Sequence, residues 1–304
     1  MPSPRSWPCE VLTGVPPGDE LVVTRSRVPA HNPFIAAVHP VGLDTWLSAE
    51  IINRGVVEPE LLAVLEAHVT ALAGSAPIHI VDVGANIGFV SIFSAAVSNR
   101  VRVTSVEATP WHYKVMELSL RLNPDLAEQV RLFKTGLGPP QPAGAPQAEL
   151  CMQVESRNGA ATFATSGPCS TDALATGGVS VPLRTLDSVL EDSWGSQVEV
   201  LKMDVEGYEP LVMSGFRLLN SAKPPRLILT EYIPFRVIRA FGGGKSAAEA
   251  FDAYFSNFGD DLEGAWDISI IGYNTASTAE ALRILRGWSD THSGGDVVLR
   301  SRKW

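Results

Sequence analysis

The sequence predicts an α/β fold with a doubly wound, mostly parallel sheet, because short apolar strands alternate with helices along most of the chain. Five apolar segments have the length of buried strands and are bounded by glycine, proline or polar residues: 78–83, 101–106, 130–136, 198–205 and 226–232. Apolar residues recur at helical spacing in 89–97, 111–122 and 209–219, each between two successive strands. This alternation is typical of a parallel sheet covered by helices on both faces.

The ends of the chain extend this core. We expect residues 1–58 to form an N-terminal extension with short strands, and residues 59–304 to form one domain that begins with a helix at 59–72. An insertion at 138–178, rich in Pro, Gly, Ser and Thr, separates the third and fourth strands. The other predicted elements are short strands at 150–156 and 179–184, helices at 246–258 and 278–288, and a late edge pair of strands at 267–273 and 296–302. The last strand of this pair is a candidate for an antiparallel orientation.

Composition excludes several functions. With 33 acidic and 24 basic residues the formal charge is −9, and a protein that neutralises nucleic-acid phosphates needs the opposite balance. Cys9, Cys151 and Cys169 are too few and too scattered for a disulfide framework, and the six histidines show no metal-binding spacing. The N-terminus lacks a secretory signal, and no apolar run reaches the length of a membrane span. We therefore expect a soluble cytoplasmic protein, with organellar targeting left open.

A glycine turn is the sharpest functional signal. The strand at 78–83 runs into Gly84-Ala85-Asn86-Ile87-Gly88, and glycines allow a tight turn and a close approach of backbone to a ligand. A dinucleotide site would have G-x-G-x-x-G, whereas here Asn86 replaces the central glycine and Asp82 precedes the turn. Glu107, 23 residues after Gly84, has the position of an acid that accepts hydrogen bonds from ribose hydroxyls. Two carboxylates beside an adenosine suit a cationic ligand, S-adenosylmethionine (SAM).

Five sequence blocks together resemble the FkbM-type family of class I SAM-dependent methyltransferases. They are VDVGANIG at 81–88, SVEATPWHYKVMELSLRLNP at 105–124, VPLRTLDSVL at 181–190, VLKMDVEGYEPLVMSGFRLL at 200–219 and LILTEY at 227–232, preceded by LDTWLSAEIINRG at 43–55. The resemblance covers roughly residues 43–235. One departure is Ala108-Thr109-Pro110 after Glu107, where the family more often has Glu-Pro.

The resemblance implies a seven-stranded, Rossmann-like sheet whose last strand is antiparallel. It also implies a cofactor site, in which Asp82, Gly84, Ala85, Asn86 and Gly88 surround the methionine part of SAM and Glu107 and Ala108 hold the ribose side. The insertion at 138–178 and the segment 236–304 match the family less well, so we expect them to act in substrate choice.

A second acidic cluster follows the fourth and fifth strands. Asp204, Glu206 and Glu231 all come at carboxyl ends of strands, where open parallel sheets bind ligands. In one interpretation one of them is a general base for a substrate hydroxyl; in another, Asp204 and Glu231 bind a divalent ion. Glu209 is instead expected to favour the start of a helix through the helix dipole, and His112 to face solvent.

The combined prediction is a SAM-dependent methyltransferase, with Asp204, Glu206 and Glu231 as catalytic residues, no assigned metal ligand and SAM as cofactor. The resemblance implies methyl transfer to a hydroxyl of a sugar, glycan or secondary metabolite. An N- or protein methyltransferase and a non-catalytic SAM-binding module remain alternatives, and a nicotinamide-dependent oxidoreductase is disfavoured by Asp82 and Asn86. The expected partner is a small-molecule or glycan acceptor, with no nucleic acid and no membrane span. The sequence does not fix the oligomeric state.

Overall fold

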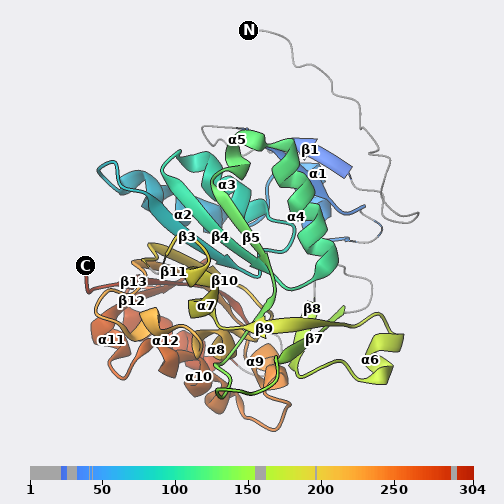
Figure 1. Cartoon of the computed structure of the whole chain (residues 1–304). Helices are drawn as coiled ribbons and strands as arrows, with labels where there is room; N and C mark the ends of the chain where they lie inside the picture. The colour runs from blue at the N-terminus through green and yellow to red at the C-terminus, as the bar shows by residue number, and fades with distance from the viewer. Residues whose placement is uncertain are drawn as a thin grey trace.

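The computed structural model describes residues 22–25, 33–40, 42, 44–154, 162–195, 197–288 and 293–304 (Figure 1). Cys9 and the first part of the predicted N-terminal extension lie outside these residues.

A seven-stranded sheet forms the centre of the molecule, in the order β12-β13-β11-β10-β3-β4-β5. Its strands are β3 (Ile78–Val83), β4 (Val101–Glu107), β5 (Val130–Lys134), β10 (Val200–Met203), β11 (Leu227–Tyr232), β12 (Trp266–Ile270) and β13 (Gly295–Ser301). The pairs among β3, β4, β5, β10 and β11 are parallel, and β13 is antiparallel to both β11 and β12. The predicted fold class is confirmed, including the late pair of strands at one end of the sheet and the antiparallel orientation of the last strand.

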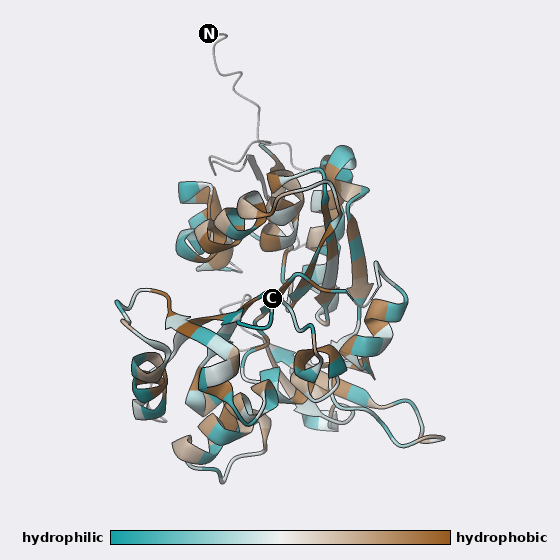
Figure 2. Ribbon diagram, turned by 90° about the vertical axis from the view of Figure 1, so that its left-hand side faces the viewer, coloured by the Kyte–Doolittle hydropathy of each residue, from teal (hydrophilic) through white to brown (hydrophobic). Residues whose placement is uncertain are grey.

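Helices cover both faces of this sheet, as Figure 1 shows. The alternation of side chains along a strand explains the two layers: Ile78 and Ile80 of β3 face one apolar cluster, and Val81 and Val83 face the other. The first cluster contains α1 (Leu47–Arg54), α2 (Pro59–Ala71), α3 (Phe89–Val97), α4 (Pro110–Leu122) and α5 (Pro124–Ala127). The second contains α7 (Leu186–Glu191), α8 (Glu209–Met213), α10 (Ala247–Phe255) and α12 (Thr278–Gly287). Figure 2 shows the hydrophobic residues concentrated in the central strands.

Short elements complete the chain after the sheet strands. They are η1 (Arg217–Asn220), α9 (Pro234–Ala240), η2 (Ser256–Phe258) and α11 (Leu262–Ala265). The helix predicted at 209–219 is interrupted, because the chain at Gly215 passes so close to the carbonyl oxygen of Gly138 that a Cβ would overlap it. None of the helices within the described ranges is long and apolar enough to cross a bilayer.

The insertion forms more structure than the sequence predicted. Four strands, β6 (Gly136–Leu137), β7 (Glu149–Val154), β8 (Thr162–Ser166) and β9 (Val179–Arg184), make a second sheet in the order β6-β9-β7-β8, and α6 (Thr171–Ala175) follows β8. Strands β7 and β9 were predicted, whereas β8 and α6 lie in the part of the insertion for which the sequence predicted no element.

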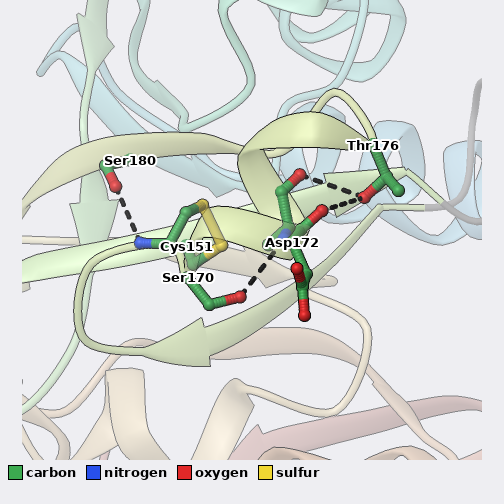
Figure 3. The surroundings of a disulfide bond; sticks show 7 residues. Cys151, Ser170, Asp172, Thr176 and Ser180 are labelled. Atoms are coloured by element: carbon green, nitrogen blue, oxygen red, sulfur yellow. Dashed lines mark hydrogen bonds between the residues drawn. A yellow bond between two sulfur atoms is a disulfide. The ribbon is translucent and has the colours of Figure 1, made fainter.

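A disulfide joins Cys151 of β7 to Cys169, which precedes α6 (Figure 3). The backbone N–H of Cys169 also donates to Ser180 Oγ of β9. The disulfide and this hydrogen bond together attach the segment before α6 to β7 and β9 of the small sheet. The sequence, whose cysteines are too few and too scattered for a disulfide framework, did not predict this single bond. A separation of 18 residues gave no signal, because the antiparallel pairing of β7 with β8 is what brings the two sulfurs together. The expectation of a cytoplasmic location therefore loses the support of the cysteine pattern.

The N-terminal extension is partly built into the domain. Strand β1 (Val22–Arg25) pairs antiparallel with β2 (Ile35–Val38), and the backbone N–H of Ala37 donates to Ser119 Oγ of α4 at 2.8 Å. Phe34, Leu47 and Ile51 are buried in the same apolar cluster as α3. Residues 44–58 thereby reach the edge of the sheet at which the functional site lies.

Candidate active site

The glycine turn lies at the carboxyl end of β3, between the ends of β4 and β10. The backbone N–H groups of Gly84 and Ala85 both donate to Val106 O at 3.0 Å. Gly84 has a φ of +73°, and a Cβ at this position would overlap the backbone oxygen of Asp204. Gly88 has a φ of +84°, and a Cβ there would overlap the Met116 side chain of α4. Both glycines are therefore required by the close approach of other parts of the protein as well as by the turn.

Asp82 lies beneath this turn and is fully buried. Its carboxylate accepts a hydrogen bond from Ser91 Oγ at 2.5 Å and lies 3.5 Å from Lys202 Nζ. Lys202 in turn donates to Gly84 O at 3.1 Å. Although burial lowers the pKa of Lys202, the charges of Asp82 and Asp204 raise it overall, so this ammonium is protonated. The ion pair thus fixes the turn from below, and Asp82 is absent from the described lining of the two pockets next to it.

The first pocket lies between the glycine turn, the end of β4 and the small sheet, and encloses about 630 Å³ including its open mouth. Its floor carries Glu107 and Ala108, and its walls include Leu137, Leu150 and Met152. Glu107 is buried; one carboxylate oxygen accepts from the N–H of Asn86 at 2.8 Å and the other from that of Thr109 at 2.7 Å. Burial raises the pKa of Glu107, and these two N–H groups offset part of the rise.

His112 belongs to the same pocket. Its ring is buried and its Nδ1 lies 4.0 Å from Glu107 Oε1. The expectation that His112 faces solvent is therefore wrong: the first turn of α4 points inward here, and β2 covers its other side, with the His39 and His112 rings 5.3 Å apart.

A second pocket adjoins the first and shares Gly84, Asn86, Asp204 and Glu206 with it. Its lining adds Ala85 from the turn, Glu231 from β11, and residues that the sequence analysis did not select: Trp46, Glu58, Lys202 and Arg236. The three predicted acids Asp204, Glu206 and Glu231, here called the rim acids, therefore lie together at one edge of the sheet, beside the predicted cofactor loop.

Arg236 of α9 binds two of the three rim acids. Its guanidinium forms ion pairs with both Glu206 and Glu231, the latter at 2.8 Å. Glu206 has a φ of 59°. The next residue, Gly207, has to be glycine, because a Cβ at position 207 would overlap the backbone of Arg236. Burial and the charge of Asp204 raise the pKa of Glu231 in spite of this ion pair. Asp204 lines both pockets, with a side chain that is 32% exposed.

Glu209 has a structural role, as the sequence predicted, but it acts through a hydrogen bond to a loop and not only through the helix dipole. Its buried carboxylate accepts a hydrogen bond from the N–H of Val205 at 2.8 Å and so shapes the loop between β10 and α8. Burial raises its pKa to about 7.

The metal interpretation finds no support in these contacts. Within the described ranges, no group of three or more His, Cys, Asp or Glu side chains is arranged to hold a metal ion. Arg236 supplies the positive charge between Glu206 and Glu231.

The geometry fits SAM. Glu107 uses one lone pair on each oxygen for backbone N–H groups, which leaves acceptor capacity for two ribose hydroxyls. The apolar walls beside it suit an adenine ring, and the acidic second pocket next to the turn suits a sulfonium and an ammonium group.

Comparison with known proteins identifies the family of the chain. Residues 82–261, more than half of the chain, match the sequence model of the methyltransferase FkbM domain. The protein is a class I SAM-dependent methyltransferase. The chain belongs to the FkbM methyltransferase family, and its cofactor is SAM.

Similar solved structures are more distant. The precorrin-6Y C5,15-methyltransferase of Geobacter metallireducens is 12% identical, with a TM-score of 0.39 over 81% of this chain and 89% of that chain. The O-methyltransferase of Bacillus cereus in complex with SAH is 10% identical, with a TM-score of 0.39 over 85% of this chain and 97% of that chain. No curated protein sequence matches this chain significantly.

Proposed function

We propose that the protein methylates a hydroxyl group on a sugar, glycan or secondary metabolite. The observation that carries this proposal is the second pocket, in which carboxylates surround the space beside the glycine turn and Trp46 lies at the edge, 51% exposed. Carboxylates accept hydrogen bonds from hydroxyl groups, and an exposed aromatic ring offers a flat apolar surface to the rest of such an acceptor.

Within this pocket the three rim acids have different roles. Arg236 holds Glu206 and Glu231, and these two acids position the acceptor through their remaining lone pairs. Asp204 reaches both pockets, which favours it as the group that accepts the hydroxyl proton. When bound, SAM supplies an electrophilic methyl group. Alignment of the acceptor oxygen with that methyl group accounts for much of the expected rate.

Segments outside the core of the fold contribute to substrate choice. Leu150, Met152 and Ala164, from the small sheet of the insertion, line the first pocket, and Arg236 begins the segment 236–304. Trp46 and Glu58 come from residues 1–58, so this extension acts together with the domain at 59–304 rather than as a separate unit.

The test is transfer of radiolabelled methyl from SAM to a panel of methyl glycosides and phenols, with amino sugars and lysine peptides alongside. We expect base-stable label on the hydroxyl compounds. In Asp204→Asn, turnover should fall by about 10²–10⁴-fold while S-adenosylhomocysteine (SAH) still stabilises the fold. Label on amines alone would replace the proposal with N-methylation. Intact SAH binding without transfer to any compound would favour a non-catalytic SAM-binding module.

A further inference from the structure

Glu58 is a pocket residue to which the proposed function assigns no specific contact. It lies in the turn before α2, with φ 49° and ψ 51°, a left-handed conformation that non-glycine residues adopt rarely. Among the described residues, three non-glycine residues have positive φ: Glu58, Asn86 and Glu206. All three line the second pocket. Such strained backbone persists where the surrounding structure imposes it, and it gathers at functional sites.

Three of the four acids that line the second pocket lie in ion pairs, and Glu58 is the fourth. Asp204 lies 3.8 Å from Lys202, and Arg236 binds both Glu206 and Glu231. Lys202 is further engaged with Asp82 and Gly84 O. The Glu58 carboxylate makes no hydrogen bond or ion pair with any side chain or backbone group in the described part of the chain. Glu58 is half-buried at the pocket wall, and a carboxylate that has lost part of its water is stabilised when a ligand brings a cation or donors to it.

Glu58 acts at the glycine-turn end of the pocket rather than at the Arg236 end. After burial, the charges that influence it most are those of Lys202, Asp204, Asp296 and Asp82. Lys202 and Asp82 are the groups that hold Gly84. Glu58 therefore faces the part of the site that receives the amino-acid end of the cofactor.

We propose that the Glu58 carboxylate binds the ammonium group of the methionine moiety of SAM. An ammonium group supplies three N–H donors and the positive charge that the pocket lacks at this wall. Glu58 is thus a cofactor-binding residue contributed by the N-terminal extension, and the assignment is independent of which acceptor is methylated.

The proposal predicts that cofactor binding is linked to protons. Burial raises the pKa of Glu58 to about 7 in the ligand-free protein; Asp204, Asp296 and Asp82 add to the rise and Lys202 opposes it. A bound ammonium favours the carboxylate form and lowers this pKa. Affinity for SAH should therefore increase as the pH rises through about 7, and binding at pH 7 should release about half a proton.

The experiment compares two ligands by titration calorimetry: SAH, and 5′-methylthioadenosine, which lacks the amino-acid end. Both are neutral thioethers, so the sulfonium plays no part. We expect Glu58→Gln to weaken SAH binding by about 10- to 100-fold and to leave 5′-methylthioadenosine binding within about twofold of the wild type. Glu60→Gln, an exposed acid on the same helix, is the matched control and should bind both ligands normally.

Two results with Glu58→Gln would overturn the proposal. Unchanged SAH affinity in Glu58→Gln would exclude the contact, and an equal loss for both ligands would mean that Glu58 only shapes the pocket. If the variant does not fold, calorimetry of the wild type in buffers of different ionisation enthalpy decides the matter. Proton release with SAH but not with 5′-methylthioadenosine supports the contact, and equal release with both excludes it. No acceptor is used, so a failure here is separate from a failure of O-methylation.

Discussion

At the scale of single residues, the buried carboxylates Glu107, Glu209 and Asp82 perform different tasks because they have different hydrogen-bond and ion-pair partners. Glu209 binds one N–H within its own loop, so it fixes a local turn. Glu107 binds Asn86 and Thr109, which belong to the loops after β3 and β4, and therefore joins the two turns that flank the first pocket. Asp82 binds Ser91 and Lys202 and supports the glycine turn from below. Of these three acids, Glu107 is the one with a pocket-facing carboxylate.

Replacement of Glu107 by alanine should weaken cofactor binding. SAH at about 100 times its dissociation constant stabilises a protein by about 2.7 kcal/mol, and we expect the corresponding rise in melting temperature to shrink strongly in Glu107→Ala. The control is Glu117→Ala, which removes a 44% exposed acid from α4 and should keep the full shift. Normal SAH affinity in Glu107→Ala would remove the ribose role from this residue.

At the scale of elements, close backbone contacts lock the loops of the site against each other. Gly84 brings the turn after β3 against the Asp204 carbonyl at the end of β10. Gly207 brings the next loop against the start of α9, where Arg236 lies. Since Arg236 then holds Glu206 and Glu231, the positions of the rim acids depend on the packing of three loops rather than on any one strand.

A pair of glycine variants tests this packing. Gly84 and Gly74 both have positive φ, but a Cβ at Gly84 meets the Asp204 backbone whereas one at Gly74 meets open space. Gly74→Ala should cost about 1–2 kcal/mol of unfolding free energy from backbone strain alone. Gly84→Ala should cost about 1–3 kcal/mol more, because backbone cannot move aside cheaply. Urea unfolding measures both, and equal costs would show that the loops can separate without penalty.

At the scale of the whole molecule, the sequence predicted what is local and missed what depends on distant contacts. The strands, the glycine turn and the acids at strand ends follow from periodicity within about ten residues, so the fold and the edge of the sheet that holds Asp204 and Glu231 were predictable. Glu58 reaches the pocket because α1 and α2 pack against α3, and Arg236 reaches it because α9 turns back over the loop after β10. No local sequence pattern indicates that Glu58 or Arg236 lies at the pocket, and none indicates the Cys151–Cys169 disulfide.

Protonation of the buried acids also couples the site to global stability. Burial raises the pKa of Glu58 and Glu209 to about 7 and that of Asp296 to about 6. A raised carboxyl pKa means that the native state binds the proton more tightly, so the stability it contributes is complete at low pH and is lost as the pH rises through the native value. His79 acts in the opposite direction, because burial lowers its pKa to about 4, but its effect fades above about pH 6.5 as the unfolded state also loses the proton.

Between pH 6.5 and 8 the raised carboxyl pKa values outweigh the fading histidine effect, and the ligand-free protein should become less stable as the pH rises. Glu209→Gln keeps an oxygen that accepts the Val205 N–H but carries no charge, so it should flatten this decline and match or exceed the wild type at pH 8. Urea unfolding at several pH values measures the slope. A wild-type stability that rises from pH 6.5 to 8 would contradict the raised pKa values as a group. An unchanged slope in Glu209→Gln would show that this carboxyl has an ordinary pKa in the native state, and the decline would then belong to the other buried carboxyls with raised pKa values, Glu58, Glu231 and Asp296.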